Sequence, residues 1–417
     1  MNQPSCSHTR EQANIGCSSP VRQPASPPPL LTRSLPRSVT ELLARFRGCF
    51  TTPTFQTFTA LVAGFWAQPG PRTVTGMLIA TGLAGVWHHS RAHRFFSAAH
   101  WSPDQLGLCL LDLAVATLVP AGAPVRLVVD ETLFRRTGRK VFGTGWHHDP
   151  LGTGRRAVAW GNNWVVLGVL VDLPFLPHRP VCLPVLARLW RPGQTTGRLG
   201  LGDELVRLAC TRLGGKRVDL VCDGAYAGRE LRDLPKQVTV TCRLRVDAAL
   251  HWLPPSPTGR PGRPRTKGDR LPDLVELAGT VGTPFALLAV TRYRRQELVA
   301  VAGFTCLWPR VFGPRPVSVV LVRDPAAPDG FDLALVSTCL DATPAQLIER
   351  YATRWSVEVC FREARQDAGV GQARNRTRLA VERTVPFGLI CYGLAIVWYA
   401  LHGHDPADLA ARRARAP

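Results

Sequence analysis

Lysine is scarce in this sequence. The chain has 417 residues, and its lysines are Lys140, Lys216, Lys236 and Lys267. Arginine therefore carries nearly all of the positive charge, since Lys and Arg together number 51 against 30 Asp and Glu, a formal net charge of +21. An excess of this size creates a positive field that attracts polyanions. Nucleic acid is the expected partner, although an anionic membrane surface would satisfy the same electrostatics.

The cysteines lack the spacing typical of metal-binding or redox motifs. The 12 cysteines are irregularly spaced and include no Cys-x-x-Cys, which argues against zinc ribbons and redox motifs. Many lie within apolar runs, and we predict that they are reduced core residues. Examples are Cys109, Cys182, Cys222 and Cys391.

Two enzyme classes lack support because their motifs are missing. No Gly-x-Ser-x-Gly elbow occurs, so hydrolase chemistry has no local signal. The glycine-rich stretch GTGWHHDPLGTGRR lacks the Gly-Lys-Ser/Thr of a nucleotide-binding loop. Its His147, His148 and Asp149 are flanked by Gly and Pro, which favours a hairpin between strands over a metal site.

Long hydrophobic runs are also scarce. The segment from Val385 to Leu401 lies at the short limit for a membrane-spanning helix and has no second segment like it. We predict a buried helix there, and no membrane partner. Residues 1–37 are rich in Pro, Ser, Gln and Arg and lack the apolar core of a signal peptide. They are predicted to form a disordered basic tail on a cytoplasmic protein.

The rest of the chain divides by pattern, and its length suits more than one structural unit. Residues 38–120 show apolar spacing typical of helices, including a cap at Ser102 followed by Pro103. This helical unit is the expected DNA-binding domain. The stretch from Thr73 to Ala99 reads as two short helices, and it fits a helix-turn-helix DNA reader or ordinary helix packing.

Beyond residue 120 the pattern changes to mixed α/β. Residues 121–247 contain short runs rich in Val and Leu with a helix among them. Residues 248–336 add strand-like segments, which predicts a β-rich insertion. Residues 337–417 return to helices.

Two apolar runs end in an acid. VRLVV leads into Asp130 and VDLVC leads into Asp223. A strand that stops at an acid places the carboxylate at the edge of the sheet, where neighbouring strands bring a second one close. Either Asp alone is compatible with a simple turn. Two carboxylates held together need a positive partner, and divalent metals fill that role at sites of phosphoryl chemistry.

A third acid comes from the stretch YATRWSVEVCFREARQ. Thr343, Pro344 and Gln346 form a capping-box start and Gly369 is a plausible terminator, which predicts one helix to about Asp367. At about 100° per residue, the side chains sharing one face fall within an arc of about 60°. They are Tyr351, Arg354, Glu358 and Arg365. A solvated ion-pair stripe is the alternative, because Arg354 and Glu358 are four residues apart.

These motifs resemble the bacterial insertion-sequence transposases of the DDE superfamily, within the branch that carries a Tyr-Arg-Glu-Lys signature. The resemblance covers about Pro124 to Asp367, and its ordered spacing is fairly specific. It implies an RNase H-like core that binds two Mg2+ ions, for which Mn2+ can substitute. The implied catalytic and metal-binding residues are Asp130, Asp223 and Glu358. One departure is that Arg365 stands where the family has lysine, which keeps the charge but changes its geometry.

The expected DNA contacts include more than the signature residues. Tyr351, Arg354 and Arg365 would contact phosphates near the cut bond. The GRPGRPR stretch resembles the Gly-Arg-Pro core that lies in A/T-rich minor grooves, although a flexible basic linker would look the same. Arg243 and Arg245 alternate along an expected strand, facing either the DNA channel or solvent. The basic residues expected in the GRPGRPR region are Arg260, Arg263 and Arg265.

The expected function is therefore metal-dependent cleavage of DNA at the ends of an insertion sequence, followed by strand transfer. The resemblance also implies a homodimer on paired ends, associated with the nucleoid. The alternatives are an RNase H-like nuclease without strand transfer and a transposase-derived DNA-binding protein that has lost catalysis.

Overall fold

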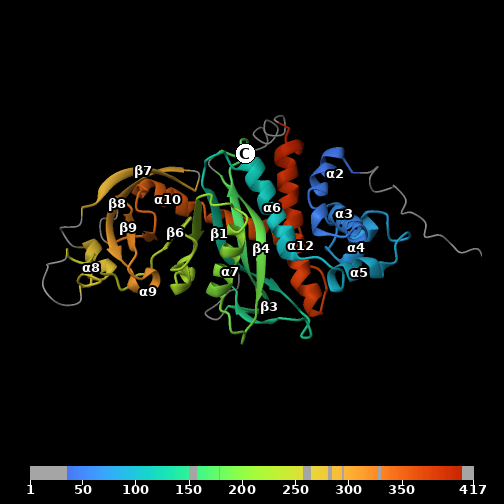
Figure 1. The fold of residues 1–417 in the computed structure, drawn as a ribbon, viewed down its shortest axis with the longest axis horizontal. Coiled ribbons are helices and arrows are strands. Elements are labelled where there is room, and N and C mark those ends of the chain that lie inside the picture. The colour runs from blue at the N-terminus through green and yellow to red at the C-terminus, as the bar shows by residue number, and fades with distance from the viewer. Residues whose placement is uncertain are drawn as a thin grey trace, which may run out of the picture.

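The computed structural model describes residues 35–149, 157–177, 179–256, 264–279, 284–293, 295–326 and 330–405. A single mixed sheet runs through the middle of the molecule, with helices on its faces and a helical unit at one side (Figure 1). The predicted α/β class, with helical N-terminal and C-terminal regions, is confirmed. The predicted tail lies outside the described residues as far as residue 34, and the first described helix begins at Arg37.

The N-terminal unit is helical, as predicted. Ser102 accepts a hydrogen bond from the amide of Gln105 and Pro103 opens the following helix, which confirms the expected cap. The two short helices expected between Thr73 and Ala99 are also present. The elements are α2 (Arg37–Ala44), η1 (Arg47–Cys49), α3 (Thr52–Ala67), α4 (Val74–Ala80), α5 (His89–Ser97) and α6 (Pro103–Leu118).

The first half of the sheet comes from the region after residue 120. β1 is antiparallel to β3 and parallel to β5, and β5 is parallel to β6. All of β5 is buried, because helices cover both faces of its parallel neighbourhood. The elements are β1 (Val125–Arg135), β2 (Gly145–His148), β3 (Val158–Val171), β4 (Val181–Trp190), α7 (Arg198–Cys210), β5 (Val218–Cys222), η2 (Gly224–Tyr226), η3 (Arg229–Leu231) and β6 (Val238–Arg243).

The β-rich segment that follows continues the same sheet. Its last strand pairs with β6, so the strand order is β2-β3-β1-β5-β6-β10-β9-β8-β7. β4 also pairs with β3, on the same side as β2. The elements are α8 (Leu274–Gly279), β7 (Ala286–Arg292), β8 (Arg295–Leu307), α9 (Pro309–Phe312), β9 (Pro316–Arg323) and β10 (Leu333–Ser337).

The C-terminal region is helical, with one correction. The capping box at Thr343 and Gln346 is present, and Gly369 follows the last turn with a φ of 68°. The single helix expected between them is wrong, because the chain tightens at Thr353 and Arg354. The amides of Thr353 and Arg354 each bond to the carbonyl three residues earlier, which divides the segment. The elements are α10 (Pro344–Ala352), α11 (Trp355–Gln366), α12 (Arg378–Trp398) and the π-helical turn η4 (Tyr399–Gly403).

α12 is the predicted buried helix. It packs against β4, α6 and the N-terminal helices, which joins the helical unit to the sheet (Figure 1). In the part of the chain described here, Arg378–Gly403 is the one helix long and apolar enough to cross a membrane, and 61% of that apolar window is buried inside the protein. Cys182, Cys222 and Cys391 are buried and reduced as predicted, whereas Cys109 is only half-buried.

Candidate active site

Asp130 and Asp223 lie side by side at the point where two parallel strands stop pairing. The β1–β5 ladder ends at Val129 and Cys222, and the two acids are the next residues. Neighbouring strands lie about 4.8 Å apart, so the carboxylates are close. Asp223 follows the end of β5 as predicted. The expectation that β1 ends at Asp130 is wrong. β1 continues to Arg135, because β3 remains its partner.

Arg354 connects Asp130 to Glu358. Its Nη1 lies 2.9 Å from Asp130 Oδ2 and its Nη2 lies 2.6 Å from Glu358 Oε1. The Arg354 side chain is 15% exposed and that of Asp130 is 17% exposed, so water screens the contact only weakly. The guanidinium thus lies between an acid on the sheet and an acid on α11.

Burial controls the ionisation of Asp130. It raises the pKa of this carboxyl to about 6, although Arg354 and the amide of Glu131 oppose the change. The carboxylates of Glu358 and Asp223 raise the same pKa further, which places all three acids within electrostatic reach of one another. The cluster therefore resists carrying its full negative charge.

The other signature residues border this cluster. Tyr351 lies at the end of α10, and burial raises the pKa of its phenol to about 12, with Arg354 opposing. The Arg354 guanidinium carbon lies 5.8 Å from the centre of the Tyr351 ring. Arg365 donates to Thr132 Oγ1 at 2.7 Å, two residues beyond Asp130 on β1. The turn between α10 and α11 thus still brings Tyr351, Arg354 and Glu358 together.

The remaining predicted DNA contacts lie elsewhere. Arg243 ends β6, is exposed, and lies near enough to Tyr351 to influence its pKa. Arg245 was expected on the same strand, but β6 ends at Arg243. Arg245 instead pairs with Asp247 at 2.9 Å. Arg265 is exposed and pairs with Asp269 at 2.7 Å. Arg260 and Arg263 lie outside the described residues.

One polar network next to the site was not predicted. Glu131 accepts from Arg198 Nη1 at 2.7 Å and from Asn163 Nδ2 at 3.0 Å. Because successive strand residues point to opposite faces, this network holds β1 from the side opposite Asp130. The two asparagines inside the apolar run of β3 were a signal for it, since buried amides need partners.

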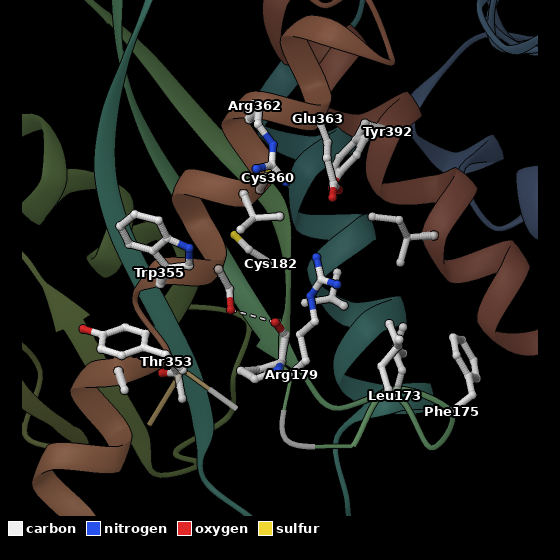
Figure 2. Close-up of a pocket in the computed structure, with 18 of the residues that line it drawn as sticks. Leu173, Phe175, Arg179, Cys182, Thr353, Trp355, Cys360, Arg362, Glu363 and Tyr392 are labelled. Carbon is white, nitrogen blue, oxygen red and sulfur yellow. Dashed lines mark hydrogen bonds between the residues drawn. The ribbon is translucent and has the colours of Figure 1, made fainter. Parts of the chain in front are cut away.

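α11 also borders a cavity of about 1030 Å³ (Figure 2). Trp355, Cys360 and Arg362 line it from this helix, and Leu173 and Phe175 line it from the segment before β4. Glu363 is held there by the Tyr392 hydroxyl, which donates to Glu363 Oε2 at 2.7 Å. Glu363 is therefore engaged away from Asp130, unlike Glu358.

A family model for DDE superfamily endonucleases matches residues 45–301. The chain belongs to this family, and its fold is an RNase H-like DDE core. It is thus a nuclease-type enzyme whose substrate is DNA. The match includes Asp130 and Asp223 and ends before Glu358. No curated protein matches the sequence.

The donor set at the site fits a divalent metal, which this superfamily generally uses. Carboxylate oxygens are the ligands that Mg2+ prefers. Burial, and repulsion from Glu358 and Asp223, raise the pKa of Asp130, and a bound divalent cation favours the ionised carboxylate against both. Within the described residues, no three acidic, histidine or cysteine side chains are already gathered at metal-binding spacing. The Arg354 guanidinium instead lies between Asp130 and Glu358.

Proposed function

We propose that this protein is a transposase of the Tyr-Arg-Glu-Lys branch, with Arg365 in place of the lysine. It cuts DNA at the ends of its own insertion sequence and joins the freed 3′-hydroxyls to target DNA. The contact of Arg354 with both Asp130 and Glu358 carries the proposal, because it unites an acid from the sheet with an acid far along the chain.

The carboxylates of Asp130, Asp223 and Glu358 would hold Mg2+, with Mn2+ as a substitute. Bound metal activates the attacking oxygen and stabilises the leaving 3′-oxygen. The three side chains would bind in their ionised forms. Arg354 would leave the carboxylates at the same time, which frees its guanidinium for a DNA phosphate.

Tyr351 and Arg365 would position the DNA strand. Arg365 bonds to Thr132 of β1, and Tyr351 lies against Arg354, so both border the acids. Arg243 extends this basic border. DNA contacts by Arg245, Arg260, Arg263 and Arg265 stay part of the proposal, and the last three belong to the GRPGRPR stretch.

The other regions would serve DNA ends and assembly. Residues 38–120 are proposed as the end-binding domain, residues 121–247 and 337–417 as the catalytic core, and residues 248–336 as its insertion. A homodimer on paired element ends, acting at the bacterial nucleoid, completes the proposal.

The test compares Glu358→Gln with Glu363→Gln, which change two glutamates of the same helix. Each purified protein is incubated with a supercoiled plasmid carrying the DNA that flanks the gene, with Mg2+ or with EDTA. We expect Mg2+-dependent breaks at the flanks for wild type and Glu363→Gln, and a loss of at least about 100-fold for Glu358→Gln. Thermal melts check that each variant is folded.

The outcomes separate the rival functions. Breaks without joined products would favour a nuclease that lacks strand transfer. If every protein binds the plasmid and none cuts it, the catalytic proposal fails and a DNA-binding protein without catalysis takes its place. Equal loss in two folded glutamate variants would contradict the assignment of Glu358.

A further inference from the structure

Two loops beyond the acids are joined into one structural unit. The first, residues 136–144, follows β1, and the second, residues 371–377, follows α11. Arg136 Nη1 donates to the carbonyls of Gly371 at 2.6 Å and Ala373 at 2.8 Å. The amide of Phe142 donates to the carbonyl of Arg376 at 3.0 Å. These bonds fix the two loops against each other.

The exposed cations of this loop pair are not neutralised. Arg139, Lys140, Arg374 and Arg376 are exposed, and within the described residues no carboxylate forms an ion pair with any of them. The acids nearby are engaged elsewhere: Asp149 pairs with Arg135, and Glu382 pairs with Arg378. The loops therefore present positive charge that is available to an anionic partner.

An exposed tryptophan lies beside these cations. Trp146 is 67% exposed and contacts Trp160 edge to face, with ring centres 5.7 Å apart. The Trp160 indole N–H points to the carbonyl of Gly138, in the first loop. A large aromatic ring left in solvent among cations is typical of a nucleic-acid contact rather than of a core. We define the loop-pair surface as Arg139, Lys140, Trp146, Arg374 and Arg376.

The position of the loop-pair surface follows from the strands. From Asp130 to Arg135 β1 rises about 17 Å, at about 3.3 Å per residue. That distance corresponds to about five base pairs of duplex DNA at 3.4 Å each. β5 ends opposite Val129, so beyond Asp130 no described strand pairs with that side of β1. Arg365, bonded to Thr132, adds positive charge between the acids and the loops.

We propose that the loop-pair surface binds the backbone of the DNA duplex on one side of the cut bond, about five to ten base pairs away. The inference rests on the proposed function, because it places the cut at Asp130, Asp223 and Glu358. Binding is independent of base sequence, since the cations meet phosphates and Trp146 packs on the sugar-phosphate edge. The contact holds the flanking duplex while the acids act.

The test measures DNA affinity against salt concentration, using the full-length Glu358→Gln protein and fluorescent duplexes from the gene's flank. Arg139→Ala/Lys140→Ala is compared with Lys216→Ala/Arg217→Ala. The control pair is also exposed and also forms no ion pair with any described residue, but it precedes β5 at the opposite end of β1. Each phosphate contact contributes about 0.9 to the slope of log affinity against log salt.

We expect the slope to fall by about 2 for Arg139→Ala/Lys140→Ala and to stay unchanged for the control pair. Trp146→Ala should weaken binding several-fold at every salt concentration. Shortening the duplex to about three base pairs on either side of the cut should remove the difference between the pairs.

Two results would overturn the inference. They are an unchanged slope for Arg139→Ala/Lys140→Ala, and an equal fall for both pairs. Cleavage assays on the same substitutions in the active protein distinguish this failure from failure of the proposed function. If the active protein cuts its flanks while the slopes do not differ, the loop-pair surface is wrong and the transposase proposal stands.

Discussion

Two requirements of the site conflict at Asp130. It must be ionised to hold a metal, yet burial and two neighbouring acids raise its pKa to about 6. Arg354 favours the ionised form, because its Nη1 donates to the Asp130 carboxylate. A residue held in this balance responds to both pH and metal.

The balance predicts a pH-dependent stability in EDTA. The ordinary pKa of Asp130 is 3.8 and the folded value is about 6, so the folded state binds the proton more tightly. Protonated Asp130 therefore stabilises the fold below about pH 4, and this stabilisation of about 3 kcal/mol is lost as pH rises through about 6. Chemical denaturation of wild type and Asp130→Asn at several pH values measures it.

The difference between the two proteins reports on Asp130 and the groups coupled to it, because the titrating groups elsewhere in the chain are the same. The free energy of unfolding of wild type, minus that of Asp130→Asn, should fall by about 2.4 kcal/mol from pH 4 to pH 7. A difference that stays constant across this range would show that Asp130 titrates normally in the folded protein.

The places of Asp130 and Asp223 in the sheet were predictable from the sequence because each follows an apolar run, and apolar runs predict strands. The direct bond between Arg354 and Asp130 was not, because it joins residues 224 positions apart. The role of Glu131 was also missed. Glu131 follows Asp130 on the strand, so its side chain points to the opposite face and takes no part in the cluster of acids. Its partner Arg198 comes from a helix that packs there only in the folded protein.

At the scale of elements, two arginines hold the α10–α11 pair against the sheet. Arg350 of α10 pairs with Asp219 of β5 at 3.1 Å, and Thr239 also donates to that aspartate. Arg354, at the turn between the helices, bonds to Asp130 of β1. Both pairs are largely buried, but only the second belongs to the candidate metal site.

This difference predicts opposite responses to Mg2+. Arg354→Ala and Arg350→Ala should each lower the free energy of unfolding by about 3 kcal/mol in EDTA, because each leaves a buried carboxylate unpaired. Mg2+ should restore much of the loss in Arg354→Ala, since the acids can then bind metal without displacing a guanidinium. Thermal melts across an Mg2+ titration provide the measurement.

Arg350→Ala is the matched control, because it loses the same type of contact outside the metal site. Its response to Mg2+ should equal that of wild type. Equal Mg2+ shifts in all three proteins would contradict the view that Arg354 competes with metal.

The helix starts were easier to predict than the break between α10 and α11. The capping box and Pro344 are local signals, and they placed the start correctly. The tightening at Thr353 and Arg354 has no such signal, because neither residue is a helix breaker. The contacts of the two helices with different strands, through Arg350 and Arg354, are tertiary and accompany the break.

At the scale of the whole molecule, long-range pairing decides the architecture. The strands expected between residues 248 and 336 are present, but their place in the sheet depends on β10 pairing with β6, across about 95 residues of chain. The helical unit likewise joins the sheet through α12, from the other end of the sequence. Neither pairing leaves a local trace in the sequence.

Arg383 of α12 binds the C-terminal region to the N-terminal helical unit. It is 7% exposed and lies in the second turn of α12. Its Nη1 donates to the carbonyl of Ala99 at 2.7 Å, and its Nη2 donates to that of Trp101 at 2.6 Å. Both carbonyls lie in the connection between α5 and α6. One guanidinium thus satisfies backbone groups of the N-terminal unit from a C-terminal helix.

Arg383→Met should therefore lower the free energy of unfolding by about 3 kcal/mol, because charged hydrogen bonds to buried carbonyls are lost while most of the packing is kept. Limited proteolysis should show faster cleavage between α5 and α6. Arg378→Ala is the control on the same helix, since its exposed pair with Glu382 contributes less than about 0.5 kcal/mol. If the two variants unfold alike and resist protease alike, α12 does not depend on Arg383 to hold the helical unit, and apolar packing alone joins the two ends of the chain.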